Sequence, residues 1–507
     1  LPSVGVGAMK NREDVRVYGR KGEVTMWFPD ANQPAYKKLG QYCVEKQISV
    51  DLISCCNGHD QQKSNGTKPA VTSSFADVAT IGTISKLTGG DVLNFSSFNI
   101  KSKRNTERLK REMLRILTND VALESVLKIR CSEGLRPVAI HGCGVAKTNS
   151  ETNIPVVKED TAFCATFEYT QDLPENESTA YLQISFLYTT TTGERVVRVF
   201  NIVLSLTSQL SSVFRHSNID VVTNLLCKKA LSKIDSETSL TSVREAMLKR
   251  CIKILHAYRK FCATASSSGQ LILPEALKFL PLLALALRKS VWLRSNKAMD
   301  PNPEINADSR ATAILNLQSS SAPLFTSTLY PFLFCLNGIT EKDGTRRTVD
   351  ETTTRRYADK FVLPKPDYPS SENLSEDGLV LLVAGLDIYF WVGRKVDRTI
   401  IQHLFGMFDL PTNPRRLSRI DFHRRENDLS QRIHNIIDCV KRRLYTDVNR
   451  FRTHIVLQSE GMSKSNNALE NTFLSYLIED KTRHGMSHVE MLCHVHKKIQ
   501  QKMNEYD

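Results

Sequence analysis

Changes in the hydrophobic period divide the chain into four segments. Up to about Asp120, short β-branched runs alternate with helical patterns, as in "FADVATIGTISKLTGGDVLNF", which predicts a helix, a stop at Gly89-Gly90 and a strand. Together with a buried strand near "QISVDLISCC", this order favours an α/β layer. Between Val121 and Leu206 the period becomes two, and "STAYLQISFLYTTTTGERVVRVFNIVLSL" predicts a hairpin turning at Gly193. This second segment is predicted to be an antiparallel β-domain.

The second half of the chain changes period twice more. From about Ser208 to Gln318 the pattern is helical, and "LTSVREAMLKRCIKILHAYRKFC" predicts its longest amphipathic helix. Beyond it, "LSEDGLVLLVAGLDIYFWVGRKV" predicts two strands around Gly385 with alternate residues on one face. A basic loop, a helix, the strand "RTHIVLQSE" and a last helix follow, so the fourth segment is predicted to mix helices and strands.

The most apolar stretch, "LILPEALKFLPLLALALRKS", is too short to cross a membrane. Only the nine residues between Lys278 and Arg288 are uncharged, whereas a spanning helix needs about twenty apolar residues. Pro281 is expected to kink or restart the helix. The stretch therefore predicts a buried helix of a helical domain, and the protein is expected to be soluble.

Net charge indicates the class of partner, and cysteine usage indicates the redox state of the thiols. The net charge of +14 favours a polyanionic partner, either nucleic acid or an acidic membrane face. Twelve scattered cysteines without a Cys-x-x-Cys pair indicate reduced, cytosolic thiols. In "KSKRNTERLKREMLRILTND" the spacing predicts a helix with an apolar stripe of Leu109, Met113, Ile116 and Leu117 and basic residues on its other faces.

Motifs for catalysis and metal binding are missing or weak. The sequence has neither a Walker phosphate loop nor a G-x-S-x-G elbow. "CHVH" at Cys493–His496, with His488, does not place its ligands for a tetrahedral ion, because successive residues of one helix diverge. We therefore expect a binding protein that is not an enzyme, with no catalytic residues and no metal ligands.

Six blocks in order resemble one known family. They are "ISVDL" with "FADVATIGTISKLTGGDV", "LKIRCSEGL", "FLYTTTTGERVVRVFNIVLSLTSQLSSVFRHSNIDVV", "GQLILPEALKFLPLLALALRKS", "LSEDGLVLLVAGLDIYFWVGR" and "LIEDKTRHGMSHVEMLCHVHKKI". Together they are similar to the cargo-selecting subunits of the COPII vesicle coat.

The resemblance implies a multidomain α+β fold. Its expected parts are the C-terminal part of a von Willebrand-A-like trunk (1–121), an antiparallel β-sandwich (122–207), an all-helical domain (208–320) and a gelsolin-like α/β domain with a C-terminal helix (321–507). The family's four-cysteine zinc ribbon is expected upstream of Leu1. No cofactor is therefore expected in this chain.

The resemblance also implies a function. The chain would be a non-enzymatic adaptor in transport from the endoplasmic reticulum to the Golgi, cytoplasmic and peripheral on exit sites and COPII vesicles. Its partners would be the GTPase-activating sibling subunit, the small coat GTPase, the cytosolic tails of cargo receptors and fusion proteins, and the acidic membrane surface. Nucleic acid is not expected as a partner.

One cargo site is carried over by residue. The family reads acidic di-residue signals with two basic residues, two apart, on the first strand after the trunk, and in "VLKIRCSEGL" these positions are Lys128 and Arg130. Alternation on a strand places both on one face, where two cations suit carboxylates. Lys128 stands where the family usually has arginine, which removes bidentate geometry. The basic residues Lys101, Lys103, Arg104 and Arg108 are the candidates for the membrane-facing surface.

Three other functions stay open from the sequence. The sibling GTPase-activating subunit shares the same domain order. A nucleic-acid-binding protein would account for the charge, although no recognition motif is present. An actin regulator would account only for the gelsolin-like segment, because that fold hosts several functions.

Overall fold

The computed structural model describes residues 5–9, 12–17, 22–30, 32–57, 75–173, 177–232, 239–263, 269–294, 306–347, 360–417, 419–420, 422–445, 450–459, 468–482 and 485–505. The chain divides into two compact units, which are treated separately below. The first comprises Leu1–Leu280, Ser290–Ser321 and Lys498–Asp507, and the second comprises Pro281–Lys289 and Ala322–Lys497.

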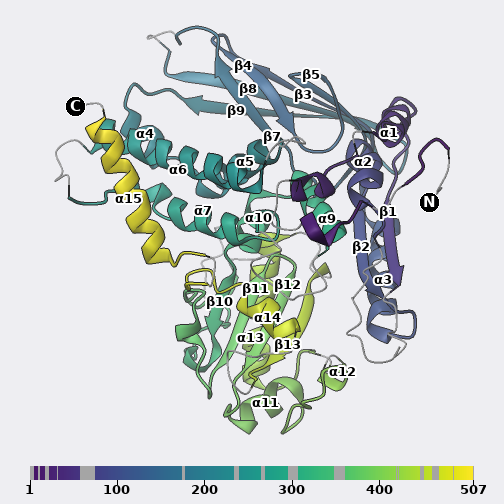
Figure 1. Ribbon diagram of the computed structural model, residues 1–507, viewed down its shortest axis with the longest axis vertical. Coiled ribbons are helices and arrows are strands. Elements are labelled where there is room, and N and C mark those ends of the chain that lie inside the picture. The colour runs from purple at the N-terminus through teal and green to yellow at the C-terminus, as the bar shows by residue number, and fades with distance from the viewer. Residues whose placement is uncertain are drawn as a thin grey trace. The chain divides into compact units, whose positions relative to one another are not determined.

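The first unit holds an α/β layer, a β-sandwich and a group of helices (Figure 1). Its strands are β1 (Leu52–Asn57), β2 (Val92–Phe98), β3 (Val121–Cys131), β4 (Leu135–His141), β5 (Val145–Thr148), β6 (Glu151–Lys158), β7 (Cys164–Tyr169), β8 (Thr179–Thr189) and β9 (Arg195–Ser205). Its helices are α1 (Ala35–Glu45), α2 (Val78–Thr88), α3 (Lys103–Thr118), α4 (Leu210–Arg215), α5 (Ile219–Leu231), α6 (Leu240–Cys262) and α9 (Ala307–Ser319). Two further helices, α7 (Leu280–Lys289) and α15 (His488–Asn504), take residues from both units.

The α/β layer confirms the predicted order of strand, helix and strand. β1 and β2 pair in parallel, and α2 lies between them in the chain. α2 ends at Gly89, whose φ of 83° suits the left-handed cap that glycine adopts without strain. A Cβ atom at Gly89 would lie 2.0 Å from the carbonyl oxygen of Val156 on β6, so only glycine fits this close approach.

The predicted apolar stripe of α3 is covered only in part: Leu109 and Ile116 are half-buried, whereas Met113 and Leu117 are exposed and charged residues point inward. Glu112 and Arg115 are each only 6% exposed, whereas Leu117 is 79% exposed. Arg115 donates from Nη2 to Asp91 Oδ2 at 2.6 Å and from Nε to Glu112 Oε2 at 3.1 Å. Hydrophobic periodicity does not register charged residues that are buried in ion pairs, so it does not predict this inward face.

The β-sandwich follows the predicted period of two. Its larger sheet has the strand order β5-β6-β3-β8-β9, and β4 pairs with β7 in a second sheet. β8 and β9 form the predicted hairpin over eleven paired positions, with Gly193 at φ 89° in the turn. Leu127, Cys143 and Ile154 form the buried core between the sheets, where partly buried apolar residues complete it.

The predicted helical pattern after the sandwich is also confirmed. α5 begins at an Asn218 cap, whose side chain accepts from the backbone N–H groups of Asp220 and Val221. α6 extends over 23 residues, and the apolar positions of its inward face, among them Leu255, are buried.

The most apolar stretch forms a buried helix, as its charge spacing predicts. A short 3-10 turn at Glu275–Leu277 precedes α7, which restarts next to Pro281. Residues 282–287 of α7 are all buried. No helix in the described ranges combines the length and the apolarity that a membrane crossing requires.

The second unit is built on one mixed sheet. Its strands are β10 (Phe332–Cys335), β11 (Leu379–Ala384), β12 (Asp387–Val392) and β13 (Arg452–Leu457), in the order β10-β11-β12-β13. The helices of this unit are α10 (Ala322–Leu329), α11 (Arg398–Phe405), α12 (Pro414–Leu417), α13 (Asp428–Leu444) and α14 (Ala468–Leu474). β12 runs antiparallel to β11 and parallel to β13.

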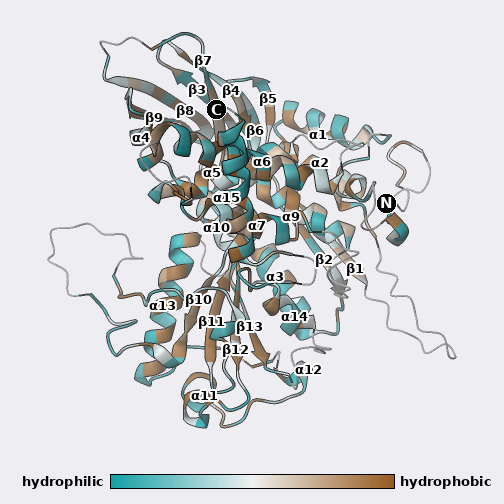
Figure 2. Ribbon diagram, turned by 60° about the vertical axis from the view of Figure 1, so that its left-hand side comes forward, coloured by the Kyte–Doolittle hydropathy of each residue, from teal (hydrophilic) through white to brown (hydrophobic). Residues whose placement is uncertain are grey.

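Both faces of this sheet are covered, which accounts for its continuous hydrophobic strands. In β12, Ile388, Phe390 and Val392 share one core cluster, which includes residues of α11 and α13. Tyr389 and Trp391 join a second cluster with Phe473 of α14 on the other face. Figure 2 shows β11 coloured as hydrophobic along its length, as expected for a strand buried on both sides.

A buried carboxylate in the first unit predicts a pH-dependent stability. Asp308 of α9 is 1% exposed and accepts from the backbone N–H groups of Ala76 and Val78 at 2.7 and 2.8 Å. Burial raises the pKa of Asp308 to about 6, above its ordinary value of 3.8. Because the folded state binds the proton more tightly, Asp308 contributes stability below pH 4 that is lost as the pH rises through about 6.

We therefore compare the unfolding temperatures of the parent chain and an Asp308→Asn variant. As the pH is raised from 4 to 6.5, the unfolding temperature of the parent chain should decrease relative to that of the variant, and above pH 6.5 the difference should stay constant. The loss corresponds to about 1–3 kcal/mol of unfolding free energy. Calorimetric scans of both proteins at closely spaced pH values measure it. Parallel pH profiles for the two proteins would contradict the assignment.

Candidate functional site

The sequence-predicted cargo residues lie together on the outer face of the larger sandwich sheet. In β3 the alternate residues Leu127 and Ile129 are 6% and 5% exposed and point into the core. Lys128 and Arg130 occupy the positions between and after them, so both side chains point outward. We call this outward surface around Lys128 and Arg130 the cationic face; its role in binding remains a prediction.

Lys128 is held by a carboxylate of the neighbouring strand. In the pairing of β3 with β6, Lys128 stands directly opposite Glu151. Its Nζ lies 3.0 Å from Glu151 Oε2, and Nζ of Lys147 on β5 lies 3.1 Å from Glu151 Oε1. The pKa of Glu151 is held below its ordinary value, first by the hydrogen bond from Lys128 and then by the one from Lys147. One carboxylate therefore bridges two ammonium groups.

Arg130 has neutral neighbours instead. Its Nη1 donates to Gln183 Oε1 at 3.2 Å and to Ser185 Oγ at 3.4 Å, both on β8. Gln183 in turn donates to Asn201 on β9, which keeps its amide oriented toward the guanidinium. Over the described residues, no carboxylate lies within ion-pair distance of Arg130. Its charge is available to an incoming anion.

An exposed apolar row borders the cationic face. On β9, Val199 pairs with Ser185 and Asn201 pairs with Gln183, so these residues share the outward side of the sheet. Val199 and Val203 are 49% and 59% exposed. Apolar contacts beside an available cation suit a peptide that carries both a carboxylate and apolar side chains.

The four basic candidates for a membrane-facing surface lie at the start of α3 and just before it. Lys101 and Lys103 are exposed. The guanidinium carbon of Arg108 lies 4.6 Å from the ring centre of Phe95, a cation–π arrangement within the fold. The side chain of Arg104 lies outside the described part of the chain. Contact of these residues with a membrane remains a prediction.

The described residues around the weak metal motif at Cys493–His496 do not form a metal site. Cys493 is exposed on α15, and Nδ1 of His488 lies 3.4 Å from Glu479 Oε2. Among the described residues, no three His, Cys, Asp or Glu side chains converge as a metal site would require.

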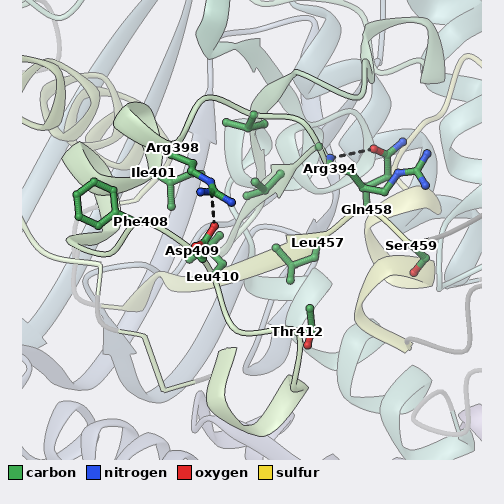
Figure 3. Close-up of a pocket in the computed structure, with 13 residues that line it drawn as sticks. Arg394, Arg398, Ile401, Phe408, Asp409, Leu410, Thr412, Leu457, Gln458 and Ser459 are labelled. Atoms are coloured by element: carbon green, nitrogen blue, oxygen red, sulfur yellow. Dashed lines mark hydrogen bonds and ion pairs between the residues drawn. The ribbon is translucent and has the colours of Figure 1, made fainter.

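A second candidate is a pocket of about 730 Å³ in the second unit. It lies at the carboxyl ends of the parallel strands β12 and β13, with Val392, Ile401, Leu410 and Leu457 among its apolar lining residues (Figure 3). Its volume is within the range of small-ligand sites.

Both arginines at this pocket already have carboxylate partners. Arg398 Nε lies 3.3 Å from Asp409 Oδ1 (Figure 3), and Arg394 is paired with Glu376. Neither arginine therefore offers an uncompensated charge to an acidic ligand. For an acidic ligand, the cationic face offers the uncompensated charge of Arg130.

The sequence predicted the two cations of the cationic face but not the residues that bind to them. Glu151, Lys147 and Gln183 come from three other strands. Their approach depends on the register between strands, which the sequence of one strand does not encode. The local signal is the spacing of Lys147 and Glu151, four residues apart across the β5–β6 turn, which brings these two side chains together.

Comparison with protein-family models supports the architecture. Residues 122–207 match the Sec23/Sec24 beta-sandwich domain, residues 218–326 match the Sec23/Sec24 helical domain, and residues 360–409 match the gelsolin repeat. These are the domain classes of a vesicle-coat subunit, in the order that the resemblance implies.

Similar proteins extend the match along the whole chain. The chain is 31% identical to protein transport protein SEC24 B of Arabidopsis thaliana over 99% of its length, and 29% identical to human Sec24C over 98%. The solved structure of the human COPII-coat protein Sec24c covers 98% of the chain with a TM-score of 0.76 and 28% identity. The chain carries the beta-sandwich and helical domains that the Sec23/Sec24 models describe, and these matching relatives are Sec24 proteins.

The match covers only part of each relative. The chain spans about two fifths of the length of these curated relatives, and 59% of the solved Sec24c chain. The sandwich, helical and gelsolin-like parts of the predicted fold class are confirmed. The relatives are named as protein transport proteins, and the solved structure as a COPII-coat protein.

Proposed function

We propose that this chain acts as the cargo-selecting adaptor of the COPII coat in transport from the endoplasmic reticulum to the Golgi. The observation that carries the proposal is the match to Sec24 proteins over nearly all of the chain. The adaptor binds and does not catalyse. The adaptor binds a sorting signal in the cytosolic tail of the cargo and thereby links the cargo to the coat.

The cationic face is the proposed site for acidic sorting signals. Lys128 and Arg130 are two residues apart on one side of β3, a spacing of roughly 6–7 Å along a strand. That spacing suits two carboxylates of one extended peptide. Arg130 engages one carboxylate directly, while the neighbouring valines of β9 contact apolar side chains of the peptide.

The partners follow from the same proposal. The adaptor pairs with the GTPase-activating sibling subunit and, through it, with the small coat GTPase. Lys101, Lys103, Arg104 and Arg108 are proposed to favour the acidic cytosolic leaflet, which places the complex on exit sites of the endoplasmic reticulum.

Recruitment to membranes tests this coat function. We expect the chain to float with acidic liposomes when the sibling subunit and the GTP-loaded coat GTPase are present, and to remain largely unbound when either is omitted. Liposome flotation with all combinations of the three proteins measures this. Recruitment that does not depend on the sibling subunit would contradict the proposal, and so would stimulation of GTP hydrolysis by this chain alone.

A further inference from the structure

We propose that Glu151 is a built-in competitor that lowers the affinity of the cationic face for acidic peptides. The inference rests on the proposed cargo function and assigns a specificity-determining role to a residue outside the predicted pair. Glu151 forms with Lys128 the same kind of ion pair that a carboxylate of the peptide would form.

The geometry of Glu151 is that of a bound anion. Its two carboxylate oxygens each meet one ammonium group, Lys128 at 3.0 Å and Lys147 at 3.1 Å. The Glu151 side chain is only 13% exposed, so β3, β5 and β6 hold it in place. A peptide carboxylate that approaches Lys128 therefore meets a charge that Glu151 already compensates, and Glu151 itself repels it.

The two cations of the face are therefore unequal. Arg130 donates to the neutral oxygens of Gln183 and Ser185, which an anion can replace without leaving a charge unpaired. At Lys128 an incoming carboxylate gains less, because Glu151 already compensates the ammonium charge. We infer that Arg130 provides most of the net attraction and that Glu151 determines how much a second acidic residue adds.

The alternative role for Glu151 is to hold Lys128 in the orientation that binds the peptide. The two roles predict opposite changes in peptide affinity when Glu151 is replaced. Removal of a competitor frees Lys128 and tightens binding. Removal of a positioning carboxylate leaves Lys128 mobile and weakens binding. The substitution Glu151→Gln separates the two roles, because glutamine keeps the size of the side chain and removes only its charge.

The experiment is a fluorescence-anisotropy titration of the whole chain with a labelled extended peptide that carries two glutamates two positions apart. We expect Glu151→Gln to bind it about two- to fivefold more tightly than the parent chain, the gain expected when one partly solvent-screened ion pair no longer competes for Lys128. Glu168→Gln is the matched control, since it removes the same charge from an ion pair with Arg136 on the β4–β7 sheet. It should leave the affinity unchanged.

Two further variants make the result specific. Glu151→Ala should reproduce the gain, so that the conclusion does not depend on the fold of one variant. Adding Lys128→Ala to Glu151→Gln should remove the gain, because the competitor acts only through Lys128.

The outcomes distinguish this inference from the proposed function. Unchanged or weaker binding by both Glu151 variants, with a parent chain that binds the peptide through Arg130, would overturn the competitor role alone. Failure of the parent chain and of both Glu151 variants to bind the peptide would overturn the proposed acidic-signal site itself.

Discussion

Replacing Lys128 and Arg130 together by alanine is expected to weaken binding of an acidic sorting peptide by roughly tenfold or more, because the charged contact of Arg130, about 1.5–3 kcal/mol, is lost, while Lys128, which Glu151 already pairs, adds less. Both side chains point away from the core of the sandwich. The unfolding temperature should therefore stay close to that of the parent chain. Peptide titration by fluorescence anisotropy, with a calorimetric scan of each protein, measures both expectations.

A matched control removes the same charge elsewhere in the sandwich. Arg136 lies on β4 and Arg195 at the start of β9, and each pairs with a glutamate away from Lys128 and Arg130. Alanine at both positions should leave the peptide affinity nearly unchanged. Equal losses in the two double variants would indicate long-range attraction by net charge, and the assignment to the cationic face would fail.

Replacing Gly89 by alanine is expected to destabilise the first unit by about 3–5 kcal/mol. The new Cβ would lie 2.0 Å from the carbonyl oxygen of Val156 and 3.2 Å from the Ile154 side chain, at a φ of 83°. The helix end and β6 cannot both keep their places, so the α/β layer separates from the sandwich. Calorimetry should show a lowered transition for the first unit.

Gly193 provides the control for backbone strain alone. It has nearly the same positive φ, 89°, but a Cβ atom there meets nothing within 4 Å. Gly193→Ala should therefore cost only about 1 kcal/mol. Equal unfolding temperatures for the Gly89→Ala and Gly193→Ala variants would contradict the close approach of α2 to β6.

Where apolar residues recur with a regular spacing or in a continuous run, the sequence predicted the fold well. The β8–β9 hairpin, the strands around Gly385 and the long helix α6 all follow from spacing of apolar residues. The helix α3 did not follow the rule. Its inward face is charged, and ion pairs with Asp91 and within the helix compensate for burial, which a hydrophobic pattern does not detect.

The candidate site was predictable only in part. Strand alternation places Lys128 and Arg130 together, because successive positions of one strand determine their direction. The competitor Glu151 depends on the register between β3 and β6, which arises from the packing of both strands. The pocket beside β12 and β13 also depends on long-range assembly, since separate segments of the chain line it.

The binding of an acidic signal to the unmodified chain tests the central claim most directly. The measurement is a titration of the parent chain with the two-glutamate peptide and with the same peptide in which both glutamates are glutamines. We expect saturable binding of the acidic peptide that weakens as salt is added, and little binding of the glutamine peptide. Equal affinity for the two peptides, or no binding of either, would contradict it.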